Sequence, residues 1–253
     1  MNTAERHRLI AQAVQEAGTA TVGELAGLTG ASEMTIRRDL DHLAAHGVLE
    51  RFRGGARTLL LRGDEPPFAL RAHEAVEAKR RIAAEVASLV RDGETVLLDS
   101  GTTCLEVARL LHGRQVTVMP LSLQAVALLA DAPEPTRLLV PGGRPRPGEG
   151  ALTGPLTLAS LAALRFDTAV LGCCGLTAGD GLTAYDLDEA SVKQAAIASA
   201  RRIVAAADGS KLGRTAQAHV GPASLVHVLV TDTTAPADET AALESSGITL
   251  RRV

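Results

Sequence analysis

Apolar side chains near the start of the chain recur three and four residues apart, which is the spacing of an amphipathic helix. The first such stretch contains Ile10 and Val14, and we expect it to begin with Thr3 as N-cap and to end at Gly18. A second, short helix is expected after Thr21-Val22-Gly23-Glu24, because this sequence has the form of a capping box. The pattern therefore predicts two core-facing helices before residue 30.

A third helix is predicted from Ser32, which offers an N-cap after the break at Gly30-Ala31, to Gly47, which ends it. Its apolar side is expected to carry Met34, Ile36, Leu40 and Leu43. Two short helices that meet at a tight turn form a helix-turn-helix, in which the second helix places its first turns in the major groove of DNA.

The polar positions of this third helix are the candidates for DNA contacts: Ser32, Glu33, Thr35, Arg37 and Arg38. An arginine fork can bind guanine bidentately, whereas hydroxyl groups suit phosphates or either kind of base edge. Taken alone, two adjacent arginines are more typical of a solvated helix face, paired with Asp39 or Asp41. The following segment favours the DNA-binding interpretation.

Residues 48–53 alternate apolar and charged side chains, as a short strand should, and Gly54-Gly55 then allows a tight reversal. This pattern predicts a small β wing after the third helix. We expect the wing to lay its arginines along the phosphate backbone, where they fix register without reading sequence: Arg51, Arg53 and Arg57.

Residues 58–72 contain Pro66 and Pro67 and interrupt the helical pattern, so we place a linker there, between domains at 1–57 and 73–253. The second domain begins with a helical stretch and continues with apolar runs typical of strands buried on both faces. These runs are residues 95–99, 116–119, 137–140, 168–171, 203–206 and 226–230. Helical stretches between several of them predict an α/β domain with a largely parallel sheet.

Ligands of such sheets bind beyond the carboxyl ends of the strands. The first strand runs into Asp99-Ser100-Gly101-Thr102-Thr103 and directly into a helix, where glycine, hydroxyl groups and free N–H groups suit a phosphate monoester. An ordinary N-cap explains the same residues. A second loop, Ala207 to Lys211, follows another strand; Lys211 can supply a charge to the phosphate and Asp208 can hold a sugar hydroxyl, although a solvated turn is the alternative. Lys193 is a further candidate, but its i,i+4 pairing with Glu189 alone explains it.

Composition narrows these choices. The chain has 253 residues, and its net charge of −3 argues against indiscriminate binding of polyanions, so a DNA reader must concentrate its arginines locally. Three cysteines, two of them adjacent at Cys173-Cys174, lack the spacing of a disulfide framework or a zinc site. We expect them to fill space in the core, and we expect no disulfide, metal or cofactor. The chain shows neither a signal peptide nor a long apolar span, so we expect a cytoplasmic protein.

The string Thr35-Ile36-Arg37-Arg38-Asp39-Leu40, with Arg53-Gly54-Gly55-Ala56 downstream, resembles the DNA-binding domain of DeoR-type repressors. Arg53 stands where that family usually has a histidine. The likeness continues through Gly101-Thr102-Thr103, Pro141-Gly142-Gly143 and Asp208-Gly209-Ser210-Lys211 into the family's sensor domain. That domain is similar to ribose-5-phosphate isomerase, and the resemblance implies a phosphorylated sugar as effector.

One departure concerns residues 120–122, where the family usually shows Thr-Asn-Ser and this chain has Pro120-Leu121-Ser122. Loss of the asparagine removes an amide that both donates and accepts hydrogen bonds, so we expect the sugar end of the pocket to differ.

The sequence therefore predicts a repressor of a carbohydrate operon, not an enzyme, that binds an operator as a dimer or tetramer and responds to a sugar phosphate. Two alternatives remain open. The second domain can be a sugar-phosphate isomerase or deaminase, although no pair of carboxylates is arranged for proton transfer. It can also serve only to oligomerise a constitutive DNA-binding protein.

Overall fold

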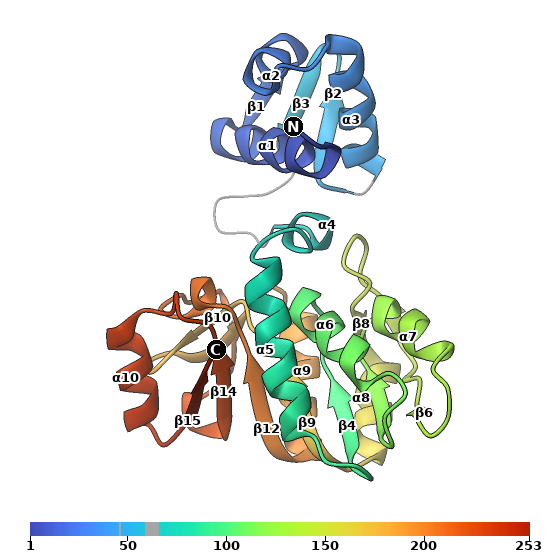
Figure 1. Cartoon of the computed structure of the whole chain (residues 1–253), viewed down its shortest axis with the longest axis vertical. Helices are drawn as coiled ribbons and strands as arrows, with labels where there is room; N and C mark the ends of the chain where they lie inside the picture. Colours follow the sequence, from blue (N-terminus) through green and yellow to red (C-terminus); the bar gives the residue numbers. More distant parts are fainter. Residues whose placement is uncertain (46, 59–65) are drawn as a thin grey trace. The chain divides into compact units, whose positions relative to one another are not determined.

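The computed structural model describes residues 1–45, 47–58 and 66–253, and the chain forms two compact units, Met1–Glu74 and Ala75–Val253 (Figure 1). Residues 59–65 of the predicted linker lie outside the described residues, as does residue 46 in the predicted third helix. The predicted domain limits stay predictions.

The first unit packs helices against a three-stranded antiparallel sheet in the order β1-β3-β2. Its elements are α1 (Thr3–Ala17), β1 (Thr19–Thr21), α2 (Val22–Thr29), α3 (Glu33–Ala45), β2 (Leu49–Phe52), β3 (Gly55–Thr58) and α4 (Phe68–Arg71). Buried apolar side chains from three helices, among them Ile10, Leu25 and Leu40, form one core. The predicted winged helix-turn-helix is thus present.

The helix ends follow the predicted capping chemistry except at the first. Asn2, and not Thr3, caps α1, because its side chain accepts a hydrogen bond from the Glu5 N–H at 2.8 Å. Thr21 and Glu24 form the predicted capping box at α2. The expectation that Met34 faces the core was wrong. Met34 lies in the first turn of α3 and is 59% exposed, whereas Ile36, Leu40 and Leu43 of the same helix are buried.

A buried carboxylate joins α1 to α3. Asp39 is 5% exposed and accepts hydrogen bonds from Arg6 Nε at 2.6 Å and Arg6 Nη2 at 3.1 Å, with His7 Nε2 at 2.9 Å. Burial raises the pKa of Asp39, but the hydrogen bonds from Arg6 and His7 outweigh burial and hold this pKa below its ordinary value. These hydrogen bonds therefore fix α3, the second helix of the helix-turn-helix, to α1.

The short helix α4 also belongs to this unit. Leu70 is 8% exposed and lies in the same core as Ile10, and Arg71 Nε donates a hydrogen bond to the Pro66 carbonyl oxygen at 2.7 Å. Part of the segment predicted as a linker is thus packed structure.

The second unit is built on a parallel sheet with helices on both faces. Its helices are α5 (Val76–Leu89), α6 (Thr102–Leu111), α7 (Leu123–Ala130), α8 (Pro155–Ala163), α9 (Leu187–Ser199) and α10 (Ala237–Ser245). Its strands are β4 (Thr95–Leu98), β5 (Thr117–Pro120), β6 (Arg137–Leu138), β7 (Arg144–Pro145), β8 (Leu152–Thr153), β9 (Phe166–Leu171), β10 (Gly175–Thr177), β11 (Gly181–Ala184), β12 (Ala200–Ala206), β13 (Ala218–Gly221), β14 (Val228–Thr231) and β15 (Thr249–Arg252).

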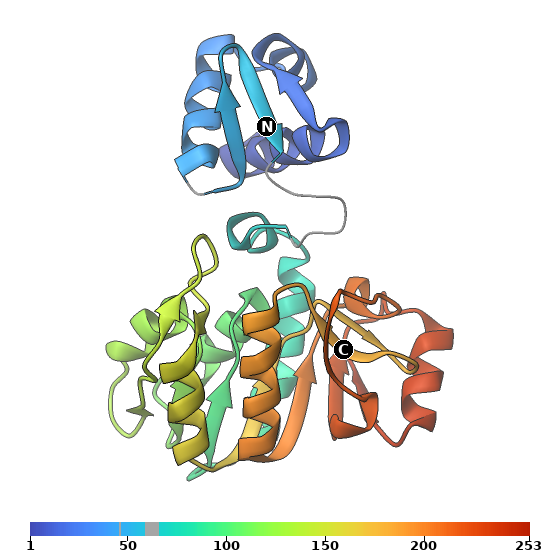
Figure 2. The same ribbon diagram turned by 180° about the vertical axis from the view of Figure 1, so that it is seen from behind.

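Within residues 75–253, seven strands pair in parallel in the order β15-β14-β12-β9-β4-β5-β6. Alternate side chains of β4 enter opposite cores: Val96 and Leu98 lie in one, Leu97 in the other. Helices α5, α6 and α7 cover the first face (Figure 1), and α8 and α9 cover the second (Figure 2). This arrangement confirms the predicted fold class.

Several strands differ from the predicted pattern. β6 is shorter than expected, and Leu139 and Val140 beyond it are 37% and 59% exposed. The separate sheet β10-β11-β13 and the edge strand β15 carry no long apolar run, which is why periodicity missed them. None of the helices in the described ranges is long and apolar enough to cross a membrane.

Replacement of Asp39 tests the α1–α3 link. Asp39→Ala removes an acceptor shared by two side chains, and we expect it to lower the free energy of unfolding by about 2 to 4 kcal/mol at neutral pH. Because the pKa of Asp39 is lowered in the folded state, its contribution to the free energy of unfolding in the wild type should disappear only as the pH falls below about 4. The stability of the variant should not show this decrease. Urea unfolding across pH measures both. The control is Glu33→Ala, an exposed carboxylate on the same helix, with an expected effect below about 1 kcal/mol; equal losses in the two variants would contradict the link.

Candidate DNA-binding surface and effector site

The turn between α2 and α3 follows from local chemistry. Gly30 ends α2 with φ 67°, a left-handed conformation that favours glycine. Ser32 Oγ then accepts a hydrogen bond from the Thr35 N–H at 3.2 Å, so Ser32 caps α3 as predicted. Ser32, Glu33, Arg37 and Arg38 are exposed and Thr35 is half-buried, so the predicted contact residues lie at the accessible start of α3.

The two arginines of α3 have different surroundings. Arg37 Nη2 lies 3.0 Å from Glu33 Oε2 in an i,i+4 pair, and both side chains are more than half exposed. Such a pair contributes little stability and exchanges readily for a phosphate or a base. Arg38 has no hydrogen-bonded or ionic partner within the described residues. The solvated-face alternative supposed that these arginines pair with Asp39 or Asp41. Instead, Asp39 pairs with Arg6, and Asp41 pairs with Arg51.

The three wing arginines differ in their contacts. Arg51 Nη1 donates to the Arg37 carbonyl oxygen at 3.1 Å and to Asp41 Oδ1 at 2.5 Å, so it ties the wing to α3. Arg57 pairs with Glu50 across the β2–β3 ladder at 2.8 and 2.9 Å. Only Arg53, at the exposed turn, lacks a hydrogen-bonded or ionic partner among the described residues.

That turn requires its glycines. Gly54 has φ 96°, and a Cβ at Gly55 would lie 2.3 Å from the Ala20 carbonyl oxygen. The predicted tight reversal of the wing is confirmed, and it presents Arg53 at the tip.

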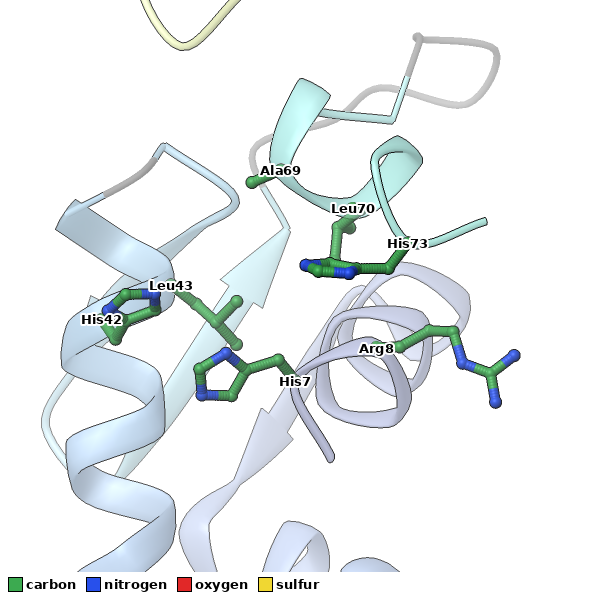
Figure 3. Close-up of a pocket in the computed structure, with 7 residues that line it drawn as sticks. All are labelled: His7, Arg8, His42, Leu43, Ala69, Leu70 and His73. Carbon is green, nitrogen blue, oxygen red and sulfur yellow. The ribbon is translucent and has the colours of Figure 1, made fainter. Parts of the chain in front are cut away.

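A pocket between α1, α3 and α4 lies on the Asp39 side of the first unit (Figure 3). Its lining residues are His7, Arg8, His42, Leu43, Ala69, Leu70 and His73. The rings of His7 and His42 stack with centroids 5.0 Å apart, whereas Arg8 extends away from them. The pocket contains none of the predicted contact residues and belongs to the packing that supports α3.

In the second unit, the loop after β4 leaves the start of α6 open. Gly101 is the N-cap residue with φ 105°, and no side chain caps the helix. Thr102 and Thr103 are 7% and 9% exposed, and within the described residues their hydroxyl groups make no hydrogen bond. These N–H and hydroxyl groups can donate to an anion.

The loop after β12 carries Lys211 in a short 3-10 helix, Gly209–Lys211. Asp208 caps this turn by accepting from Ser210, and Asp232 Oδ1 accepts from the Gly209 N–H at 2.6 Å. Lys211 is half-buried and has no hydrogen-bonded or ionic partner in the described part of the chain. The loop is fixed, and its ammonium group is available.

Beneath these loops lies a buried network of charges. Lys193 Nζ contacts Asp99 Oδ2, donates to the Gly172 carbonyl oxygen at 3.1 Å and lies 3.3 Å from Glu189 Oε1. Lys193 and Asp99 are each 2% exposed. Burial lowers the pKa of Lys193, but the charges of Asp99 and Glu189 outweigh it and hold this pKa above its ordinary value. Asp99 also accepts from the Ser100 and Gly172 N–H groups, at 2.8 and 3.0 Å, so the ion pair shapes the backbone after β4 and after β9.

Cys173 links the two groups of predicted effector residues. It follows β9 at the carboxyl edge, and burial raises the pKa of its thiol to about 12. The charges that act on this thiol include those of Lys211, Lys193, Asp208 and Asp99. The thiol therefore lies within the electrostatic influence of four predicted residues, although sequence reasoning had assigned Cys173 only to core filling. Nothing in a Cys-Cys pair indicates a neighbouring lysine.

Two further residues were not anticipated as parts of this site. Glu189 was explained as the helix partner of Lys193, yet it is 8% exposed and accepts a second ion pair from Arg146 Nη1 at 2.5 Å. Arg146 carried no signal of its own, because its partner is 43 positions away in the chain.

The departure at residues 120–122 has a structural counterpart. Leu121 and Ser122 are 1% and 2% exposed, and Ser122 Oγ accepts from the Ala125 N–H at 3.3 Å as the cap of α7. Whether this alters the sugar end of a pocket stays a prediction.

Comparison with known proteins agrees with both units. Residues 6–59 match the family model described as "DeoR-like helix-turn-helix domain", and residues 74–233 match "DeoR C terminal sensor domain". A winged helix-turn-helix in one unit and a sensor domain in the other define a DNA-binding transcriptional regulator. The chain belongs to the DeoR family.

Individual proteins are similar over nearly the whole chain. The "HTH-type transcriptional regulator GlpR" of Haloferax volcanii is 32% identical over 99% of this chain and 98% of its own length. The "Glycerol-3-phosphate regulon repressor" of Escherichia coli is also 32% identical, over 93% of each chain. Among solved structures, ribose 5-phosphate isomerase A from Methanocaldococcus jannaschii matches 54% of each chain with a TM-score of 0.41 and 20% identity.

Replacement of Lys193 tests the buried network. Lys193→Met leaves Asp99 and Glu189 without their shared cation, and we expect a loss of about 3 to 5 kcal/mol at neutral pH. Burial raises the pKa of Asp99 and Lys193 opposes this shift, so removal of the lysine raises that pKa further. A carboxyl whose folded pKa is raised is penalised above that pKa, so the deficit should shrink as the pH falls. Thermal unfolding at several pH values measures it, and a deficit that does not change with pH would argue against an unpaired carboxylate.

Proposed function

We propose that this regulator is a repressor whose affinity for its operator is controlled by a phosphorylated sugar bound at the carboxyl edge of the second unit. The observation that carries the proposal is the open start of α6, with unbonded Thr102 and Thr103 hydroxyl groups. Lys211, a half-buried cation without a partner in the described chain, supplies charge nearby. Uncapped N–H groups, hydroxyls and an ammonium group are the donors that a phosphate monoester takes.

The relatives support this chemistry. The relative from Escherichia coli is named "Glycerol-3-phosphate regulon repressor", and glycerol 3-phosphate is a small phosphate monoester. We infer a ligand of the same class for this chain, with the phosphate at the start of α6. The proposed effector residues are Asp99, Gly101, Thr102, Thr103, Lys193, Asp208 and Lys211.

Binding without catalysis is the function that the site supports best. The oxygens of Asp99 already accept from Lys193 and two backbone N–H groups, and Glu189 lies between two cations. Carboxylate oxygens that are already held by these donors are not free to take a proton from a substrate. We therefore infer that the second unit senses its ligand and does not convert it.

For the first unit we propose that α3 reads base edges while the wing contacts phosphates. The proposed DNA-binding residues are Ser32, Glu33, Thr35, Arg37, Arg38, Arg51, Arg53 and Arg57. The geometry favours Arg38 and Arg53 for direct contacts, and it gives Arg51 the further role of holding the wing on α3. Each chain contributes one recognition helix, so we propose a homodimer on two half-sites.

Specific and non-specific contacts can be separated by mutation. The double variant Thr35→Ala/Arg37→Ala should lose about 1 to 3 kcal/mol of discrimination between operator and random DNA for each base contact removed. Arg53→Ala should instead weaken binding to all sequences alike. It should also reduce the slope of log K against log salt concentration by about one. Fluorescence anisotropy across salt concentrations, with one and two half-sites, measures both effects. Equal losses on specific and random DNA for both variants would contradict this division.

The effector site can be tested through Lys211. Inorganic phosphate, glycerol 3-phosphate, ribose 5-phosphate and fructose 6-phosphate are compared by thermal shift, and operator binding is then measured with the compound that stabilises most. Lys211→Ala should bind the operator like wild type without that compound and lose at least about 1.5 kcal/mol of effector binding, as expected for a charged hydrogen bond. The control is Arg214→Ala, an exposed cation three positions along. A Lys211→Ala protein that responds normally would place the pocket elsewhere.

A further inference from the structure

The hairpin β7–β8 lies beside the carboxyl end of β5. Its two strands pair at Arg144 with Thr153 and at Pro145 with Leu152. The second strand is anchored by backbone hydrogen bonds, from the Leu152 N–H to the Leu121 carbonyl oxygen at 2.8 Å and from the Leu123 N–H to that of Gly150 at 2.9 Å. The hairpin is therefore attached on the β5 side of the sheet edge.

Arg146 connects this hairpin to the opposite side. Its side chain is 23% exposed and reaches Glu189 on α9 at 2.5 Å, and Glu189 in turn contacts Lys193 at 3.3 Å. Lys193 contacts Asp99, which holds the backbone before Gly101. Alternating charges thus run from the hairpin to the proposed phosphate loop.

These four charges balance one another before any ligand arrives. A phosphate monoester at Gly101–Thr103 adds about two negative charges, of which Lys211 can balance one, so a second cation is needed. Lys193 is committed to Asp99 and Glu189 and is 2% exposed. Arg146 lies at the accessible end of the series, and a guanidinium group binds phosphate bidentately.

We propose that Arg146 is an effector-contacting residue that pairs with Glu189 in the effector-free protein and transfers to the phosphorylated effector on binding. The transfer draws the hairpin β7–β8 with it, so the hairpin is the element that differs between the two states. This inference rests on the proposed function, because it takes the phosphate to lie at the start of α6.

The packing under the hairpin supports a second arrangement. Gln124 Nε2 donates to the Glu149 carbonyl oxygen at 3.0 Å, but Gln124 Oε1 is buried without a hydrogen-bond partner in the described structure. Gly150 covers it so closely that a Cβ there would lie 2.5 Å from Oε1. A buried acceptor without a hydrogen bond disfavours the effector-free arrangement, in which the hairpin covers Gln124. Movement of the hairpin would expose this oxygen to a donor.

The first arm of the test measures affinity. Arg146→Ala should raise the Kd for the phosphorylated compound selected with wild type by about tenfold or more, and Arg146→Lys should restore part of the loss. The matched control is Arg144→Ala on the same hairpin, 81% exposed and 3.9 Å from Asp188, whose Kd should stay within about twofold of wild type. Titration calorimetry on the full-length protein gives each value, with inorganic phosphate titrated in parallel.

The second arm separates ligand contact from a structural role. If Glu189 competes with the effector for Arg146, Glu189→Gln releases the arginine and should tighten effector binding by about threefold. If Arg146 only supports the network, Glu189→Gln should weaken binding. Unchanged affinity in Arg146→Ala, or weaker binding in Glu189→Gln, overturns the inference while the proposed function stands. If no phosphorylated compound binds wild type, the proposed function fails and this inference with it.

Discussion

The second unit depends on one buried ion pair, Lys193 with Asp99. The loops after β4 and β9 obtain part of their shape from this pair, since Asp99 holds the Ser100 and Gly172 N–H groups and Lys193 holds the Gly172 carbonyl oxygen. Burial of two charges is expensive, and an apolar pair of similar volume is often no less stable. The pair is therefore better explained by what it positions than by stability: it holds the backbone at Ser100, directly before the uncapped start of α6.

The uncapped start of α6 leaves hydrogen-bond donors for a ligand. No side chain caps this helix, and within the described residues the hydroxyl groups of Thr102 and Thr103 make no hydrogen bond, so a phosphate bound there as proposed would complete the hydrogen bonding of the loop. A ligand that satisfies such groups gains affinity because the loop is already arranged, and little ordering remains at the moment of binding. The same arrangement would make the proposed site favour anions, because a neutral sugar supplies no charge for the helix start or for Lys211.

Local chemistry predicted much of the first unit, and distance along the chain limited the rest. The capping box at Thr21, the cap at Ser32 and the glycine turn of the wing each involve neighbours within a few positions, so the residue types alone indicated them. Glu189 and Lys193 were read as a helix pair for the same reason, but their burial depends on Asp99, 94 positions from Lys193. The long apolar strands were found by their runs, whereas the short strands β10 and β11 contain glycines and lack such runs. Met34 was misplaced because helical periodicity does not indicate where the partner elements end.

The way α3 is held restricts how an effector can act on it. Asp39 ties the helix to α1 through Arg6 and His7, and Arg51 ties the wing to the Arg37 carbonyl oxygen and Asp41. Hydrogen bonds to charged groups are worth about 1.5 to 3 kcal/mol each, while allosteric coupling between two ligands typically amounts to about 1 to 3 kcal/mol in total. Deformation of α3 or the wing would break several such bonds and would consume more free energy than the coupling provides. Control of DNA binding by an effector therefore requires less free energy when the first unit keeps its internal structure.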